Sequence, residues 1–256
     1  MAVHEVAREG FGSEAETYER SRPTYPPGAM AWLVDSLRIA PPGATVVDLA
    51  AGTGKLTRLL EPAGATLIAI EPVEGMRRVL TAVLPVVPVV AGTAEALPLA
   101  PRSVDAVTVA QAFHWFDADA AFAELARVLR PRGRLGIIWN ARDRTVDWID
   151  RAWAIMDRIE KQAPWRDHEH WHQSALGERP GFGAIHEATF HHEQAFTPAG
   201  VVDRFRGVSH VATLEPEARD AVLEEVRELI ATHPDTRGKS ELRIPYRVDA
   251  YWCERA

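Results

Sequence analysis

The segment from Val46 to Gly54 constrains the fold of this chain more than any other. Its first four residues are apolar apart from Asp48, as expected at the end of a buried strand, and the small-residue turn 50–54 follows. A helical run then begins at Lys55. Glycine lets the backbone bend sharply and lets a ligand approach it, while the first N–H groups of a helix lack partners inside that helix. A strand, a small-residue turn and a helix start in this order are typical of nucleotide binding.

An acidic residue stands where such a turn needs one. The apolar run 66–70 predicts a second strand, and Glu71 follows it directly. In nucleotide-binding folds an acid about 20 residues beyond the turn accepts hydrogen bonds from the ribose hydroxyls. We therefore predict that Glu71 grips a ribose in a bidentate manner, the alternative being an acid in a solvated loop.

Three ligand classes use turns of this kind. A Walker loop is excluded, because Leu49 stands where its first glycine should be and Leu56 where its serine or threonine should be. A dinucleotide fingerprint is disfavoured, because Lys55 replaces its third glycine. The third class is S-adenosylmethionine. The heptapeptide Asp48-Leu-Ala-Ala-Gly-Thr-Gly54 resembles the first motif of class I S-adenosylmethionine-dependent methyltransferases, with Ala50 in place of the usual first glycine.

Three further segments resemble the same family, in the same order. Residues 92–99 (Gly-Thr-Ala-Glu-Ala-Leu-Pro-Leu) precede an acid and the apolar strand 103–110, and that strand leads into His114-Trp-Phe-Asp117. Together with the N-terminal stretch 11–26, they resemble the branch that has a methyltransferase type 11 domain and includes trans-aconitate methyltransferase. The resemblance covers roughly residues 11 to 140.

The resemblance implies a set of cofactor contacts. Thr93, Ala94 and Glu95 would meet the adenine ring, and Arg22, with Tyr18 nearby, would pair with the α-carboxylate of the methionine part. Asp48 would either orient the turn or reach the methionine ammonium through water. The expected cofactor-binding residues are Tyr18, Arg22, Asp48, Ala50, Gly52, Thr53, Gly54, Leu56, Glu71, Pro72, Met76, Thr93, Ala94, Glu95 and Gln111.

Gln111 and His114 lie just past the fourth predicted strand, where methyl transfer should occur. Histidine titrates near neutral pH, so His114 is the candidate general base. The alternative is that it only shapes the pocket, and a carboxylate acceptor would need no base. The expected acceptor pocket comprises Tyr25, His114, Trp115, Trp165 and Trp171.

The remaining pattern predicts an α/β fold with a doubly wound, mostly parallel, seven-stranded sheet. The expected strands are 45–49, 66–70, 86–91, 104–110, 133–140, 185–194 and 244–253. The expected helices follow Pro26-Pro27 and span 54–61, 73–84, 118–129, 146–161, 198–207 and 216–232. We expect an N-terminal arm and helix (1–43), a cofactor-binding core (44–144), a helical lid insertion (145–184) and a C-terminal part (185–256).

The lid insertion is rich in aromatic residues and histidine. His168, His170 and His172 alternate, so a metal site is conceivable, but we interpret the segment as a lid over an apolar acceptor and predict no metal.

Composition and charge argue against nucleic acid as a substrate and against a membrane location. The formal net charge of −7 argues against nucleic acid as the substrate. No run approaches the roughly 18 apolar residues that a membrane span needs, and the N-terminal residues lack the apolar stretch of a signal peptide. The single cysteine, Cys253, fits a reducing compartment, so we expect a cytoplasmic protein. The sequence leaves the oligomeric state open.

The predicted function is methyl transfer from S-adenosylmethionine to a small organic acceptor by in-line displacement, with S-adenosylhomocysteine as product. Oxygen, in a carboxylate or hydroxyl, is the favoured target. The alternatives are an NAD(P)-dependent oxidoreductase on a similar sheet and a non-catalytic S-adenosylmethionine-binding protein.

Overall fold

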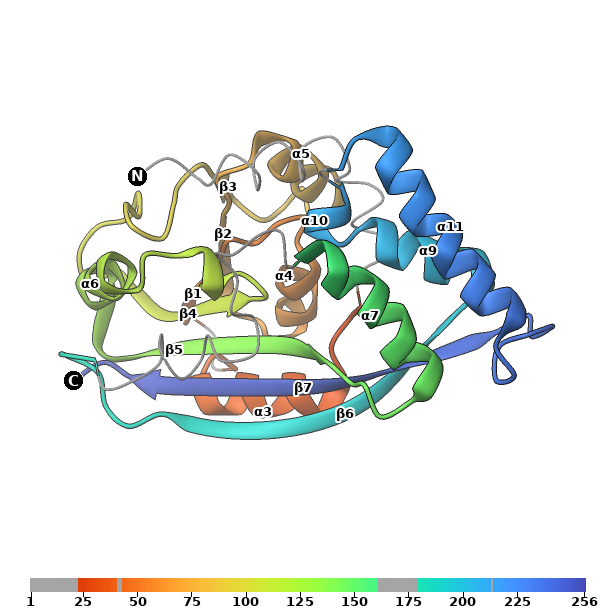
Figure 1. The fold of residues 1–256 in the computed structure, drawn as a ribbon. Helices are drawn as coiled ribbons and strands as arrows, with labels where there is room; N and C mark the ends of the chain where they lie inside the picture. Colours follow the sequence, from red (N-terminus) through yellow and green to blue (C-terminus); the bar gives the residue numbers. More distant parts are fainter. Residues whose placement is uncertain (1–22, 41–42, 161–178, 213) are drawn as a thin grey trace.

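The computed structural model describes residues 23–40, 43–160, 179–212 and 214–256. A seven-stranded sheet forms the centre, in the order β3-β2-β1-β4-β5-β7-β6 (Figure 1). Its first five strands are parallel, β7 runs antiparallel to β5, and β6 runs antiparallel to β7. The strands are β1 (Thr45–Leu49), β2 (Thr66–Ile70), β3 (Val89–Val90), β4 (Val104–Ala110), β5 (Leu129–Arg142), β6 (His186–Phe196) and β7 (Leu242–Glu254). The predicted fold class is therefore confirmed.

Helices cover both faces of the sheet. One apolar cluster joins the strands to α3, α4 and α5, and another joins them to α6 on the opposite face. The described helices are α3 (Pro27–Leu37), α4 (Lys55–Leu60), α5 (Glu74–Val83), α6 (Ala118–Val128), α7 (Asp147–Glu160), α9 (Pro198–Arg206), α10 (Ser209–Ala212) and α11 (Pro216–Thr232), with short 3-10 turns at Glu61–Ala63 and Phe113–Trp115.

The inner strands are buried on both faces, which explains their nearly continuous apolar sequences. In β1 every residue after the first is buried, Asp48 included. The helix α3 lies very close to β5, because a Cβ atom at Gly136 would come within 2.7 Å of Leu37 and 2.9 Å of Leu33. Only glycine at this position allows the helix and the strand to pack at that separation.

Two predicted strand boundaries are wrong. The strand expected at 86–91 is confined to Val89–Val90, because Pro85 and Pro88 lack the N–H groups that a longer pairing would use. The strand expected at 133–140 already begins at Leu129, which pairs with Val104 before an irregularity in the register. The segment Pro131-Arg-Gly133, which separates the expected helix 118–129 from the expected strand 133–140, therefore lies inside β5 as a bulge.

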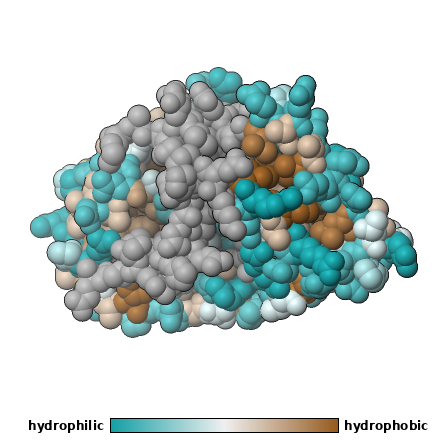
Figure 2. All heavy atoms as spheres, in the orientation of Figure 1, coloured by the Kyte–Doolittle hydropathy of each residue, from teal (hydrophilic) through white to brown (hydrophobic). Residues whose placement is uncertain are grey.

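Four helices form a second core beyond the end of the sheet. The helices α7, α9, α10 and α11 pack together and against the start of β7, with Met156, Phe205 and Val226 among their buried residues. We call these four helices the cap. Figure 1 shows them gathered at the end where β7 begins, and Figure 2 shows apolar residues at the surface in the same area. The sequence predicted three of these helices but not their joint packing.

None of the helices in the described segments is both long and apolar enough to cross a bilayer.

Candidate functional site

The candidate site lies at the carboxyl edge of the parallel strands. Asp48 pairs in register with Ala69 of β2 and with Thr108 of β4, so these strands end side by side. The turn 50–54, Glu71 and Gln111 follow the three strand ends. Ligands of doubly wound sheets bind at this edge. The structure thus brings together the residues predicted to hold the cofactor from these three strands.

The turn after β1 adopts the conformation that its small residues allow. Backbone φ angles are positive at Ala50 (55°), Gly52 (58°) and Gly54 (86°). The two glycines serve different purposes. A Cβ at Gly54 would come within 3.0 Å of Leu80 on α5, whereas at Gly52 no atom of the described residues lies within 4 Å. Gly54 therefore permits close helix packing, and Gly52 leaves its backbone accessible to a ligand.

Glu71 fastens this turn to the neighbouring strand. One carboxylate oxygen accepts a hydrogen bond from the Gly52 N–H at 2.9 Å, and the other accepts from the Val73 N–H at 2.8 Å. The side chain is buried, and this burial raises its pKa, while the two backbone N–H groups and Arg77 oppose the shift. Each carboxylate oxygen keeps a second lone pair with which it could accept from a ribose hydroxyl.

Asp48 orients the start of α4. It is fully buried, and its Oδ2 accepts from the Thr57 hydroxyl at 2.5 Å. Its Oδ1 lies 3.4 Å from the Thr108 hydroxyl. Burial raises the pKa of Asp48 to about 7, against the effect of the two hydroxyl donors. These contacts agree with a role of Asp48 in orienting the turn. Its water-mediated contact with a ligand ammonium stays a prediction.

The segment expected to meet adenine forms a tight turn. Thr93 pairs with Ala96, and the side chain of Ala94 is buried. Glu95 accepts a hydrogen bond from the Asp117 N–H at 3.0 Å, and Asp117 in turn caps α6 by accepting from the Ala120 N–H. Glu95 therefore links this turn to the beginning of α6. Its contact with an adenine amine stays a prediction.

The end of β4 carries the residues expected near methyl transfer. Gln111 has a positive φ of 58°, and its Nε2 donates to the backbone carbonyl of Asn140 at 3.4 Å. His114 is half-buried, and its ring centroid lies 5.0 Å from those of Trp115 and Trp139. Aromatic rings thus border His114, as the pocket-shaping alternative requires. A role as base stays a prediction.

The structure shows contacts between β5, β6 and β7 that were not predicted from the sequence. The Oδ1 atom of Asn140, near the end of β5, lies 3.2 Å from Nε2 of His192 on β6. The His192 ring stacks on Tyr246 of β7, with 5.3 Å between ring centroids. Burial lowers the pKa of His192. A polar residue at the carboxyl end of a parallel strand was the available signal for Asn140, but nothing in the sequence indicated its partners.

The remaining predicted site residues lie in apolar clusters, beside Glu71 or outside the described part of the chain. The side chains of Tyr25, Leu56, Met76 and Ala94 are buried within apolar clusters. The cluster that contains Tyr25 also contains residues of α3. Pro72 lies next to Glu71, and its carbonyl accepts from Arg77. The residues Tyr18, Arg22, Trp165, Trp171, His168, His170 and His172 lie outside the described part of the chain, as do residues 161–178 of the expected lid.

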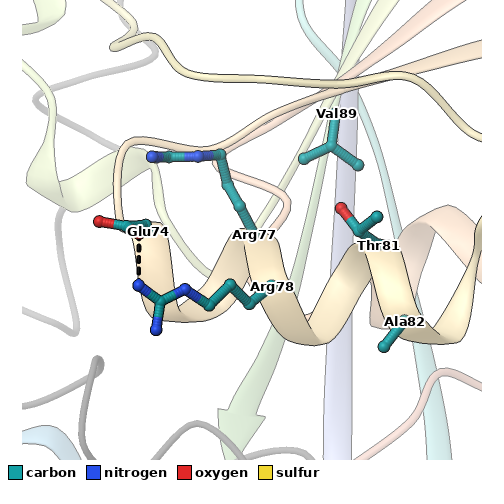
Figure 3. A pocket seen from close by; sticks show the side chains of 6 residues that line it. All are labelled: Glu74, Arg77, Arg78, Thr81, Ala82 and Val89. Atoms are coloured by element: carbon teal, nitrogen blue, oxygen red, sulfur yellow. Dashed lines mark hydrogen bonds and ion pairs between the residues drawn. The ribbon is translucent and has the colours of Figure 1, made fainter.

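A separate pocket lies against α5. Its lining comprises Glu74, Arg77, Arg78, Thr81, Ala82 and Val89, as Figure 3 shows. Arg78 pairs with Glu74, and Arg77 donates to the carbonyls of Glu71 and Pro72. None of the predicted cofactor residues lines this pocket. Within the described residues no group of three or more histidine, cysteine or acidic side chains is placed to hold a metal ion.

Known proteins match this chain along most of its length. A model of the methyltransferase domain matches residues 47–137. An uncharacterized methyltransferase of Mycobacterium tuberculosis is 40% identical over 92% of this chain and 91% of its own length. An uncharacterized methyltransferase-like protein of Schizosaccharomyces pombe is 33% identical over 96% of this chain and 95% of its own length.

A solved structure from Anaeromyxobacter dehalogenans, provisionally assigned as a type II methyltransferase, is 26% identical. It aligns with a TM-score of 0.61 over 91% of this chain and 96% of its own. The chain therefore belongs to the family of S-adenosylmethionine-dependent methyltransferases. This membership does not favour the oxidoreductase alternative, and the trans-aconitate branch stays a prediction.

The residues at the carboxyl edge fit the family's cofactor. No described residue fills the space beside Gly52, and two backbone N–H groups, one of them that of Gly52, hold the Glu71 carboxylate. Both features suit a nucleoside whose ribose needs an acceptor of hydrogen bonds.

Proposed function

We propose that this methyltransferase acts on an oxygen of a small organic acceptor, a carboxylate or a hydroxyl. Bound S-adenosylmethionine supplies a methyl group activated by its sulfonium. The chain's own residues then have to align an acceptor with that methyl group, and good alignment alone can lower a barrier by roughly 7–11 kcal/mol. Glu71 and the turn 50–54 would hold the nucleoside, and Gln111 and His114 would border the acceptor.

The single observation that favours oxygen is the composition of the acceptor edge. The segments that follow β4 and end β5, residues 111–116 and 139–142, contain no aspartate or glutamate. The acids that directly follow them, Asp117 and Asp143, accept hydrogen bonds from Ala120 and Thr145. An alkyl amine is a cation at neutral pH, so an amine acceptor would favour a carboxylate there. Neutral polar groups and aromatic rings suit a hydroxyl or a carboxylate better.

One relative supports the same target atom. A malonyl-[acyl-carrier protein] O-methyltransferase of Methylococcus capsulatus is 36% identical over 57% of this chain and 55% of its own length. Another protein with a similar fold methylates nitrogen. The phosphoethanolamine N-methyltransferase 2 of Haemonchus contortus, solved with S-adenosylhomocysteine, aligns with a TM-score of 0.57 at 14% identity. It covers all of this chain but 60% of its own.

The test is a methyl-transfer assay with labelled S-adenosylmethionine and a panel of carboxylic acids, phenols and amines. We expect labelled products from acids or phenols and none from amines. Products from amines alone would contradict oxygen as the target. Binding of S-adenosylhomocysteine without transfer to any compound would favour the non-catalytic alternative.

The role of His114 depends on the acceptor. If a hydroxyl is methylated, His114→Asn should lower kcat and remove the dependence of kcat on the histidine pKa, because the base is lost. If a carboxylate is methylated, the variant should leave the shape of the pH profile unchanged. The assay over a pH series distinguishes the two.

A further inference from the structure

One arginine of the cap is buried without a carboxylate partner among the described residues. Arg204 on α9 is 6% exposed. Its Nε donates to the Tyr246 hydroxyl at 3.3 Å, and its guanidinium carbon lies 5.6 Å from the centroid of Trp153. Within the described residues no acid forms an ion pair with it, and its Nη1 atom is enclosed without a hydrogen-bond partner.

Arg134, also buried among the described residues, has the hydrogen bonds and the ion pair that Arg204 lacks there. Arg134 on β5 is 7% exposed and pairs with Glu254 at 2.8 Å. It also donates to the Ser36 carbonyl and lies over the Trp252 ring. Burial of a charge is costly unless an opposite charge and hydrogen bonds compensate. The ring beside Arg204 compensates only a part of that cost.

Arg204 also lies at the end of a series of contacts that starts at the acceptor edge. Gln111 contacts Asn140, Asn140 contacts His192, and the His192 ring stacks on Tyr246, whose hydroxyl receives the hydrogen bond from Arg204. The cap that contains Arg204 stands beyond the ends of β5 and β6 (Figure 1). These contacts connect the end of β4 with this arginine.

We propose that Arg204 binds a carboxylate of the methyl acceptor, separate from the oxygen that receives the methyl group. A guanidinium offers donors in a planar fork that matches a carboxylate. Nη1 has no partner among the described residues, and a carboxylate that displaced the atoms enclosing it would satisfy it. Tyr246 fixes the plane of the guanidinium through Nε. The proposal rests on the proposed methyltransferase activity and specifies its substrate class as acids with a second acidic group.

The test uses the full chain saturated with S-adenosylhomocysteine. Calorimetry measures the binding of α,ω-dicarboxylates from malonate to suberate, each compared with its diamide, which has no carboxylate at either end. We expect at least one diacid to bind, and its diamide to bind about 10- to 100-fold more weakly, because a charge-assisted hydrogen bond is lost. Arg204→Met should weaken the diacid by a similar factor and leave its diamide unchanged.

Two further variants serve as controls. Arg204→Lys keeps the charge but loses the fork, so its affinity for the diacid should be intermediate. Arg206→Met removes a cation from the same helix, one that is more exposed and pairs with Asp203, and it should bind like the wild type. In labelled assays the loss in Arg204→Met should appear in KM rather than in kcat.

The outcomes separate this inference from the proposed function. If S-adenosylhomocysteine binds but no diacid does, or if Arg204→Met binds the diacid like the wild type, the role of Arg204 is overturned. If the wild type does not bind S-adenosylhomocysteine, the proposed function fails first. Unchanged S-adenosylhomocysteine binding in Arg204→Met shows that the variant is folded.

Discussion

The turn after β1 and the cap both bury ionisable side chains, but the two regions differ in how many hydrogen-bond partners those side chains have. At the turn, both oxygens of Glu71 accept from backbone N–H groups, and Asp48 accepts from Thr57. In the cap, Arg204 keeps an enclosed donor without a partner among the described residues. The chain itself completes the polar contacts of the cofactor side. On the acceptor side we propose that the substrate completes them, so that binding neutralises a charge that no described acid compensates.

Removal of Glu71 should have the largest effect of the substitutions that test this difference. In Glu71→Ala the N–H groups of Gly52 and Val73 lose their acceptors, and the free energy of unfolding should fall by about 3–6 kcal/mol, since each charge-assisted bond contributes about 1.5–3 kcal/mol. Affinity for S-adenosylhomocysteine should fall about 100-fold. Urea denaturation and calorimetry measure both.

The matched control is Glu74→Ala, which removes an exposed acid paired with Arg78 nearby. This variant should bind S-adenosylhomocysteine like the wild type. Equal losses in the two variants would show that Glu71 has no special role in holding the turn.

Asp48 should make stability depend on pH. Burial raises its pKa from 3.8 to about 7, so between these values the folded chain holds a proton that the unfolded chain releases. The free energy of unfolding should therefore fall as pH rises through this range, by up to about 4 kcal/mol. Asp48→Asn stays neutral and should lack this contribution.

Urea denaturation of both proteins in steps from about pH 5 to about pH 8 checks the sign. A difference between wild type and variant that stays constant with pH would contradict the assignment to Asp48.

Thr57 should contribute less. Thr57→Val keeps the shape but removes the hydroxyl that donates to Asp48, leaving a buried acceptor with fewer donors. We expect a loss of about 1–3 kcal/mol in the free energy of unfolding, measured by urea denaturation. Thr66→Val, at an exposed position of β2, serves as control and should change stability little. A loss no greater than the control's would mean that the hydroxyl is dispensable.

The smallest expected effect has the opposite sign. Arg204→Met replaces a buried charge, which has no ionic partner among the described residues, with an apolar side chain that fits an apolar core. The free energy of unfolding should rise by about 1 kcal/mol, in contrast to the loss at Glu71. Thermal denaturation without ligand measures it. A marked fall in Tm would mean that the contacts with Tyr246 and Trp153 outweigh the cost of burying the charge.

Much of the cofactor side could be predicted from the sequence, because its signals are local. The turn, the helix start and the acid after β2 lie within one strand–helix–strand unit, and parallel pairing places them at one edge. The strand boundaries at β3 and β5 were less predictable. At β3 the two prolines limited the pairing, and at β5 a bulge admitted residues that the sequence suggested as a loop.

The residue pattern was enough to predict the fold class and the turn after β1, since periodicity and residue size act over a few neighbouring positions. The other side of the candidate site depends on packing between distant segments. Asn140, His192, Arg204 and Tyr246 come from three strands and a helix, and their contacts join residues 42 or more positions apart. In α9, Arg204 is buried and Arg206, two positions on, is more exposed. The helical period shows that α9 has a buried side, but the packing of α7 and β7 decides which arginine lies on it.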